Sequence, residues 1–156
     1  MAGSPGAHLP ATCTVSQSLH ADDGDRAAHL PEAQMSTATD EVLAIERGFW
    51  DNANSPAFFE KTIADGCITV IEPMGAIRKP MAVQAAGQGD RWVDLEMTDV
   101  VANEVGADCL ALAYHARARR ASDGRLYSGS IASAYVRNGA GWQMALTCHQ
   151  PWKGPE

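Results

Sequence analysis

Five side chains are of the types that carry acid–base chemistry: Glu72, Asp94, Tyr114, His115 and His149. A carboxylate or an imidazole can act as a general base where an apolar pocket moves its pKa toward neutrality. A tyrosine hydroxyl can donate a hydrogen bond to an oxyanion that develops during such a reaction. If the chain is a catalyst, we expect Glu72 to be the base and Tyr114 the donor.

Glu72 and Asp94 each have a structural alternative, because alternate residues of a strand face opposite ways. Glu72 ends the strand expected over residues 67–72. Its carboxylate either points into the mouth of a pocket or is solvated at the strand end. Asp94 alternates with Val93 and Leu95, so we expect it on the surface, away from the apolar face.

Strand parity also bears on Tyr114 and the two histidines. Tyr114 shares a face with Leu112, so it is either a core tyrosine or a donor in a pocket. His115 has the parity of Arg117, which favours the outer face. His149 alternates away from the inner face of its strand. We expect it to face outward or into a dimer contact, unless a bulge re-aims the strand.

Metal and cofactor chemistry are not indicated. His115 and His149 lie on strands that a third strand separates, which puts their backbones roughly 10 Å apart. Zinc ligands instead converge within about 2 Å of one centre. We therefore expect neither a metal site nor a cofactor. A cluster of four arginines is either a solvated hairpin or a site for a phosphate or carboxylate: Arg117, Arg119, Arg120 and Arg125.

Length, charge and cysteine usage narrow the class of protein. The 156 residues suffice for one domain, and a formal charge of −7 disfavours nucleic acid and anionic lipid as partners. No apolar run approaches the roughly 20 residues of a membrane span. The start lacks the basic leader and apolar stretch of a secretory signal. We expect a cytoplasmic protein whose four cysteines, without a CxxC pair, stay reduced.

Two regions are expected along the chain. Residues 1–35 contain no aromatic side chain and little periodicity, which predicts a disordered N-terminal tail. Residues 36–153 predict a single folded domain. Within it, Asp65-Gly66 predicts a turn before the strand over 67–72, and residues 73–79 predict a loop.

Three helices are expected in the first half of this domain. The first has Thr39 as its N-cap and continues through Trp50. Its apolar stripe is interrupted by one carboxylate, Glu46. Ser55 is expected to cap a second helix that opens with the proline after it. A third helix opens at Pro80 and is closed by glycines.

An antiparallel meander is expected in the second half, because the apolar period changes to two. Turns at Ser122–Arg125 and Asn138-Gly139 favour hairpins. The inner face of the last strand is expected to hold Trp142, Met144 and Leu146. We predict an α+β fold in which the three helices pack in the concave face of a strongly curved, mainly antiparallel sheet, a cone with one open mouth. Its first expected strand starts at Trp92 and ends at a turn near Gly106, and the others cover residues 109–119, 126–136 and 142–150.

Three sequence runs carry a resemblance to a known family: EVLAIERGFW, FFEKTIADGCITVIEPMG and SAYVRNGAGWQMALTCHQP. Together they resemble the nuclear transport factor 2-like superfamily, and more narrowly its SnoaL-like branch (domain of unknown function 4440), over Asp40 to Pro151. Relatives usually end in His-Gln-Gln-Thr-Pro, whereas His149 here is displaced by two places. The resemblance implies a cone-shaped fold and commonly a homodimer. Its pocket serves isomerases, dehydratases, cyclases, epoxide hydrolases or binding alone in different relatives.

The expected function is that of a small-molecule pocket protein. It is either a cofactor-independent acid–base enzyme (isomerase, lyase or hydrolase) on a small apolar or aromatic metabolite, or a non-catalytic ligand-binding or self-associating domain. A homodimer is expected through the outer sheet face, where small or uncharged side chains recur, such as Ala111 and Ala113 with Ala145 and Thr147. The pocket is expected to be lined by Phe49, Trp50, Trp92, Leu112, Met144, Cys148 and Gln150.

Overall fold

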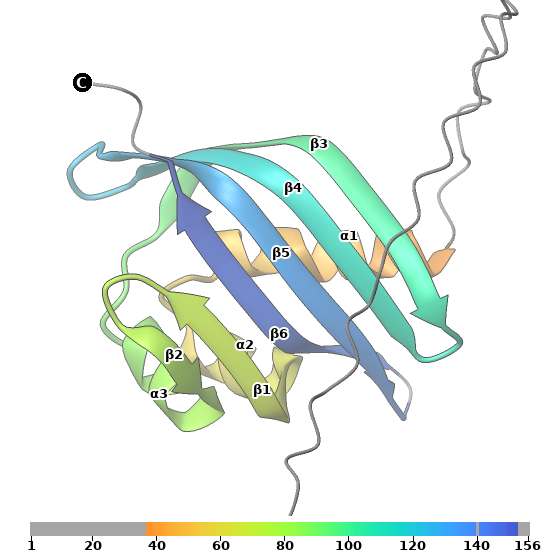
Figure 1. The fold of residues 1–156 in the computed structure, drawn as a ribbon. Helices are drawn as coiled ribbons and strands as arrows, with labels where there is room; N and C mark the ends of the chain where they lie inside the picture. The colour runs from red at the N-terminus through yellow and green to blue at the C-terminus, as the bar shows by residue number, and fades with distance from the viewer. Residues whose placement is uncertain (1–36, 140, 153–156) are drawn as a thin grey trace, which may run out of the picture. The chain divides into compact units, whose positions relative to one another are not determined.

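The computed structural model describes residues 37–139 and 141–152, and all of them belong to one compact unit, Gln34–Glu156. The tail predicted over residues 1–35 lies outside the described residues. Within the unit, three helices and six strands form a helix layer against a sheet (Figure 1). No helix of the described part is both long and apolar enough to cross a membrane.

The helices are α1 (Thr37–Asp51), α2 (Pro56–Thr62) and α3 (Lys79–Ala86). Helix α1 is already helical at Thr37, so Thr39 lies inside it as a buried residue, and the predicted cap at Thr39 is wrong. The predicted cap of α2 is confirmed. The Ser55 hydroxyl accepts a hydrogen bond from the backbone N–H of Phe58, with a proline at the first helical position.

The sheet is six-stranded in the order β2-β1-β6-β5-β4-β3. The last four strands pair as an antiparallel meander, as predicted, whereas β1 joins β6 in parallel. The strand bounds are β1 (Ile63–Ile71), β2 (Gly75–Arg78), β3 (Trp92–Gly106), β4 (Cys109–Arg120), β5 (Leu126–Asn138) and β6 (Gly141–Pro151).

Two predictions about the first hairpin are wrong. The stretch over 73–79, predicted as a loop, contains β2, which pairs antiparallel with β1. Four residues carry too little periodicity to be recognised as a strand. Asp65-Gly66, predicted as a turn, lies inside β1, where the register against β6 shifts between Ile63 and Ile68. The two residues are therefore an irregularity of a longer strand.

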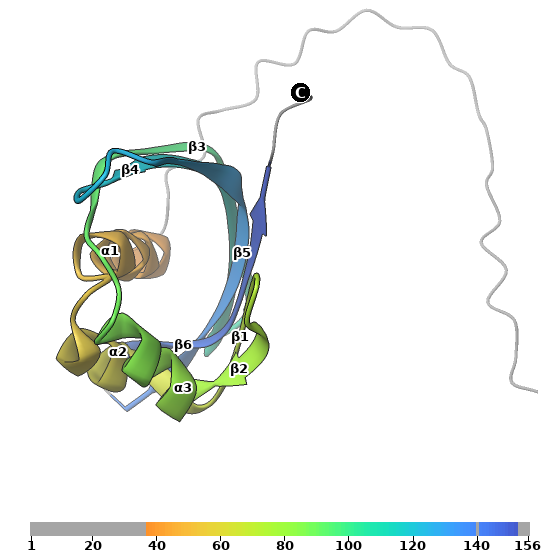
Figure 2. The same ribbon diagram turned by 90° about the vertical axis from the view of Figure 1, so that its left-hand side faces the viewer.

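The sheet bends toward the helices but does not close. Figure 2 shows the ribbon of the sheet curving around the side on which α1, α2 and α3 lie. Strands β2 and β3 are the two ends of the strand order among the described residues.

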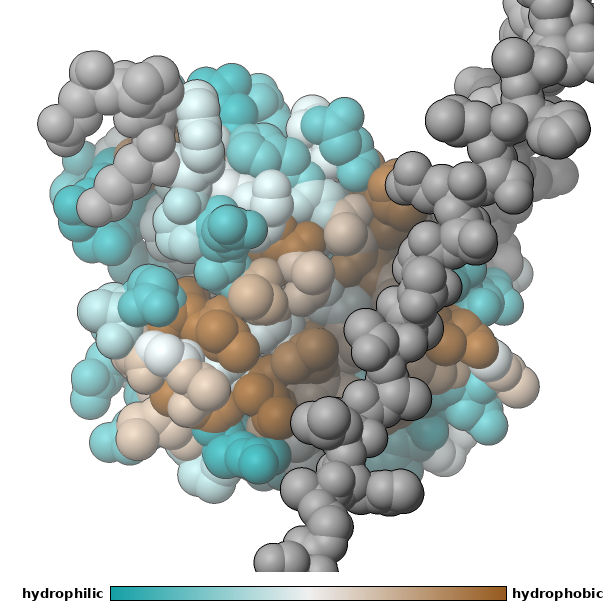
Figure 3. All heavy atoms as spheres, in the orientation of Figure 1, coloured by the Kyte–Doolittle hydropathy of each residue, from teal (hydrophilic) through white to brown (hydrophobic). Residues whose placement is uncertain are grey.

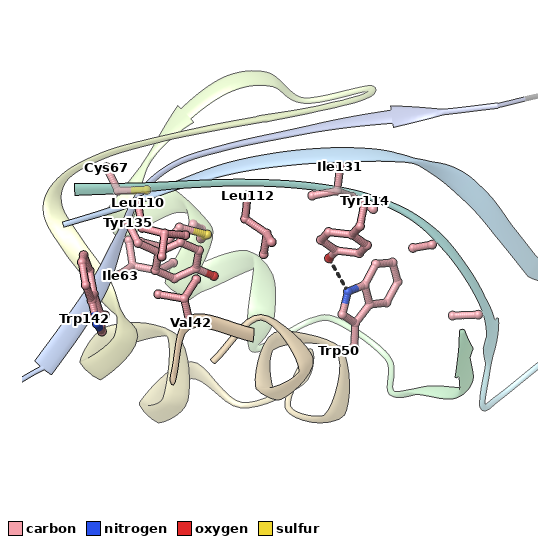
Figure 4. Packing of buried hydrophobic residues seen from close by; sticks show 14 residues of the cluster. Val42, Trp50, Ile63, Cys67, Leu110, Leu112, Tyr114, Ile131, Tyr135 and Trp142 are labelled. Atoms are coloured by element: carbon pink, nitrogen blue, oxygen red, sulfur yellow. Dashed lines mark hydrogen bonds between the residues drawn. The ribbon is translucent and has the colours of Figure 1, made fainter. Parts of the chain in front are cut away.

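The core lies between α1 and the inner face of β4 and β5. Alternate residues of β4, such as Leu110, Leu112 and Tyr114, are buried, as their apolar alternation predicted. In Figure 4, Val42 of α1 points toward the part of the core that holds Tyr135 of β5, while Trp50 is hydrogen-bonded to Tyr114 further along the helix. Burying each large apolar side chain contributes about 1.5–3 kcal/mol, so this layer fixes the position of α1 against the sheet.

A bulge in β6 reverses which residues face the core. Ala134 pairs with Leu146 and Tyr135 with Met144, so β6 carries one extra residue, Ala145, between these pairs. Beyond it, Thr147 is 3% exposed, whereas Leu146 is 41% exposed. The predictions that Leu146 faces inward and Thr147 outward are therefore wrong, because a bulge shifts the parity of every later residue.

Candidate functional site

A buried carboxylate, Glu46 of α1, is the centre of a hydrogen-bonded cluster and is 3% exposed. Its Oε1 accepts hydrogen bonds from the hydroxyls of Tyr114 (2.9 Å) and Ser133 (3.1 Å). Its Oε2 accepts a hydrogen bond from the Tyr135 hydroxyl. The indole N–H of Trp50 donates to the Tyr114 oxygen at 2.9 Å, a contact drawn in Figure 4.

The secondary structure brings these groups together. Glu46 and Trp50 are one helical turn apart and so share a face of α1. Ser133 and Tyr135 have the same parity in β5 and point to the same side of the sheet. Tyr114 comes from β4, the neighbour of β5. One helix face and two adjacent strands thus surround the carboxylate with donors.

Burial sets the protonation of this cluster. Loss of hydration raises the pKa of Glu46, and the hydrogen bonds from Tyr135, Tyr114 and Ser133 oppose that rise. The pKa values of Tyr114 and Tyr135 are raised above their ordinary value, by burial first and then by the charge of Glu46. Both tyrosines are therefore neutral donors, and Glu46 holds a proton more readily than a carboxylate in water.

A cavity of about 390 Å³ opens beside this cluster, in the range typical of small-molecule sites. Its aromatic walls are Phe49 and Trp50 of α1, Phe59 of α2, Trp92 of β3 and Tyr127 of β5. The alanines of α3 and the methionine of β6 add smaller apolar surfaces. Its polar and charged lining consists of Glu46, Thr69, Glu72, Arg120, Thr147 and His149.

The bulge in β6 brings His149 into this cavity. Its ring centroid lies 6.2 Å from that of Trp50 and 6.3 Å from that of Tyr127. Part of the residue stays accessible, but burial of the imidazole lowers its pKa to about 4, so the ring is neutral at pH 7. The prediction that His149 faces outward is wrong. A bulge in this strand was the one exception that the prediction allowed for, and the bulge is present.

Tyr127 also lines the cavity, and its hydroxyl has no hydrogen-bond partner among the described residues. Burial, and after it the nearby Cys148, raises the pKa of this hydroxyl to about 12. The rings of Trp50 and Trp92 lie 5.3 and 5.8 Å from that of Tyr127. The three rings therefore pack edge to face as one continuous aromatic wall.

The predicted site residues fall into two groups. Phe49, Trp50, Trp92, Met144 and Glu72 line the cavity, with Glu72 exposed at its edge. Leu112 is buried in the core, and Cys148 and Gln150 line shallow hollows on the outer sheet face. The Tyr114 hydroxyl lies behind the cavity wall, held between Trp50 and Glu46.

The remaining candidates are engaged elsewhere. His115 is hydrogen-bonded to Ser128 at 3.1 Å. Asp94 is exposed and lies 3.8 Å from Arg119. Two further arginines of the cluster also face carboxylates, Arg117 at 3.7 Å from Glu96 and Arg120 at 3.6 Å from Asp123. In the ranges 37–139 and 141–152, no group of three His, Cys, Asp or Glu side chains is placed to hold a metal ion.

Sequence reasoning noted Glu46 but did not place it in the site. A carboxylate in the middle of an apolar helical stripe must be buried, and a buried carboxylate requires hydrogen-bond donors. The position of Glu46 within the apolar stripe was therefore enough to predict it as a site residue. Its donors Ser133 and Tyr135 could not have been found in the same way, because they are 87 and 89 residues away along the chain.

Comparison with known proteins identifies the fold and no closer relationship. No family model and no curated protein matches this chain. A nuclear transport factor 2-like protein from Cytophaga hutchinsonii matches with a TM-score of 0.63 at 11% identity, over 76% of this chain and 100% of the other. One of unknown function from Prochlorococcus marinus gives 0.64 at 14% identity, over 78% and 97%.

A third match is the association domain of the Caenorhabditis elegans kinase CaMKII, with a TM-score of 0.59 at 11% identity, over 71% of this chain and 93% of the other. At such identities the likeness concerns the fold alone. The chain has the nuclear transport factor 2-like fold, an α+β architecture of three helices and a six-stranded, mostly antiparallel sheet.

Proposed function

We propose that this chain is a pocket protein of the SnoaL-like branch that binds a small, flat, mainly apolar or aromatic molecule. One observation carries the proposal: a cavity of about 390 Å³ combines aromatic walls with a buried carboxylate. Aromatic walls favour flat apolar ligands, and a few polar groups orient them.

The cost of burying Glu46 supports a functional role. A buried charge is expensive, and well-packed apolar residues in its place are often as stable or more so. Burying a titratable group in a cavity wall with a perturbed pKa is typical of functional sites. Glu46 meets both conditions, since burial raises its pKa and it lines the cavity.

A thermal-shift screen of aromatic fragments against a cavity-filling variant tests this proposal. Ala85 of α3 lines the cavity, so Ala85→Leu should reduce its volume and abolish the stabilisation by fragments that bind wild type. Ala57→Leu is the matched control, because Ala57 is an exposed residue of helix α2 outside the cavity lining. The proposal would be contradicted if fragments stabilised Ala85→Leu as much as wild type, or if no fragment stabilised wild type.

Acid–base catalysis without a cofactor is the second candidate, and the raised pKa of Glu46 favours it. A carboxyl group whose pKa moves toward neutrality can both take and release a proton. In this version Glu46 takes the base role predicted for Glu72. Glu72 as base with Tyr114 as donor, the assignment predicted from the sequence, is the alternative that the next experiment distinguishes.

Hydrogen–deuterium exchange of a bound ligand tests the catalytic version. In D₂O, the wild-type protein should introduce deuterium at an acidic C–H position of a ligand from the screen. NMR of the ligand would measure this uptake. Glu46→Gln should abolish this exchange, and Glu72→Gln should leave it intact. Exchange that survives Glu46→Gln would exclude Glu46 as the base.

We also propose that two copies of the chain associate through the outer face of β3–β6. Figure 3 shows apolar side chains gathered over the middle of this face. Val101 is 66% exposed and Leu146 41% exposed, and Ala113 and Ala132 are exposed between them. An apolar face of this kind favours association. The association domain among the structural neighbours has the same fold.

Ala132→Arg tests the dimer by adding a charge to the centre of this face. Analytical ultracentrifugation should show a dimer for wild type and a monomer for the variant. Ala76→Arg, at an exposed alanine of the edge strand β2, should stay dimeric. A wild-type monomer at micromolar concentration, or a dimer that tolerates Ala132→Arg, would contradict the proposal.

A further inference from the structure

We infer that the ligand of this cavity presents a hydrogen-bond donor, and specifically a protonated amine, to Glu46 and Thr147. The inference rests on the proposed function, because it names the chemical class that the same cavity would bind. It is carried by the direction of the hydrogen bonds in the cluster, which can be followed atom by atom.

Every hydroxyl and indole hydrogen of the cluster is already used inside it. Trp50 donates to Tyr114, and Tyr114 and Tyr135 donate to Glu46. Ser133 has one hydroxyl hydrogen and directs it to Glu46. The 3.0 Å contact between Ser133 and Thr147 therefore requires Thr147 to donate. No hydrogen of these groups is left to point into the cavity.

The free hydrogen-bonding capacity of the cluster consists of acceptors. A carboxylate has about four acceptor positions, and Glu46 uses three of them. Thr147 keeps oxygen lone pairs once its hydrogen is given to Ser133. Glu46 and Thr147 both lie in the cavity wall, whereas Tyr114, Ser133 and Tyr135 lie behind it. With Glu46 ionised, a ligand that reaches these two residues meets groups whose remaining capacity is to accept hydrogen bonds.

The charge of the site favours a cationic donor over a neutral one. Within 37–139 and 141–152, Glu46 takes part in no ion pair. The charged side chains in the cavity lining are Glu46, Glu72 and Arg120, which give a net of −1 when Glu46 is ionised, and a bound ammonium group would favour that ionised form. An ammonium group against Glu46 would replace its lost hydration with a charge-assisted hydrogen bond, about twice as strong as a neutral one.

Arg120 is the group that would favour the opposite class, a carboxylate. Its guanidinium already lies 3.6 Å from Asp123 and 5.8 Å from the centroid of the Trp92 ring. These contacts satisfy part of its charge at one side of the cavity. The Tyr127 hydroxyl and the neutral His149 ring can each donate a hydrogen bond, but neither is charged. Glu46 is buried without an ion pair among the described residues, so its carboxylate decides the preference.

Three probes of similar size and different polar group test the inference: phenethylamine, 2-phenylethanol and 3-phenylpropionate. Calorimetric titration of wild type at pH 7 should show the amine binding about tenfold or more tightly than the other two. Glu46→Gln, which replaces one acceptor by a donor, should weaken the amine about tenfold and change the alcohol by less than about threefold.

The outcomes distinguish failure of the amine preference from failure of the proposed ligand pocket. The inference is overturned, and the pocket kept, if the carboxylate binds tightest, if the three probes bind equally, or if Glu46→Gln leaves the amine unaffected. If none of the probes binds and the fragment screen also fails, the proposed function falls with it. Should Glu46→Gln not fold, the wild-type order decides, with Thr147→Val as a second variant that must weaken the amine.

Discussion

His149 makes the stability of this protein depend on pH, and His149→Gln measures that dependence. Burial against Trp50 and Tyr127 lowers the imidazole pKa from 6.5 to about 4. Between these two values the folded protein binds fewer protons at this position than the unfolded chain. The stabilisation is complete above the unfolded pKa and is lost as the pH falls through the folded one.

The size of the effect follows from the two pKa values. Relative to neutral pH, the free energy of unfolding should fall by about 2 kcal/mol at pH 5 and about 3 kcal/mol at pH 4 through this residue alone. Glu46 acts in the opposite sense, because burial raises its pKa and its contribution falls as the pH rises. The total pH profile therefore mixes both residues.

Urea unfolding of wild type and His149→Gln at pH 7, 5 and 4 separates them. Glu46, Glu72 and Arg120 of the same cavity wall are present in both proteins and cancel in the difference. The advantage of wild type should shrink by about 3 kcal/mol between pH 7 and pH 4. The free energy of unfolding of His149→Phe should depend on pH in the same way as that of His149→Gln, although its value at pH 7 differs. A difference that stays constant with pH would refute the inward placement of His149.

Two further substitutions probe the cluster and the strand next to the cavity. Tyr135→Phe removes a donor from the buried Glu46 and should cost about 1–3 kcal/mol of unfolding free energy in urea; a cost under about 0.5 kcal/mol would show that the bond is not needed. Gly129→Ala should cost about 1–3 kcal/mol because its Cβ would lie 2.6 Å from the Gln150 carbonyl oxygen. Gly66→Ala meets nothing within 4 Å and serves as the near-neutral control; equal effects of the two glycine variants would contradict the packing.

Local signals were enough to predict much of the fold. The alternation in β4 predicted its inner face, and Ser55 predicted the start of α2. Both hairpin turns were predicted from Asp-Gly and Asn-Gly, and Gly124 and Gly139 have φ of +70° and +59° there, a backbone region that glycine adopts without strain. These features depend on residues close together in the sequence.

The candidate site was harder to predict, because it depends on distant residues and on one inserted position. Glu46 is joined to residues 68 to 89 positions away, so no local pattern relates them. The bulge at Ala145 moves Thr147 and His149 to the inner face, and nothing in the composition of β6 marks it. A single unrecognised bulge was enough to invert the parity of the residues that line the polar end of the cavity.

The most direct test of the cavity as a ligand site is the response of individual indole N–H signals in a ¹H–¹⁵N NMR titration with phenethylamine. Trp50 and Trp92 line the cavity, whereas Trp142 donates to Glu41 outside the cavity lining. We predict saturable shifts of the Trp50 and Trp92 signals while the Trp142 signal stays in place. Shifts centred on Trp142, or no saturable shift at Trp50 and Trp92, would contradict the cavity as the binding site.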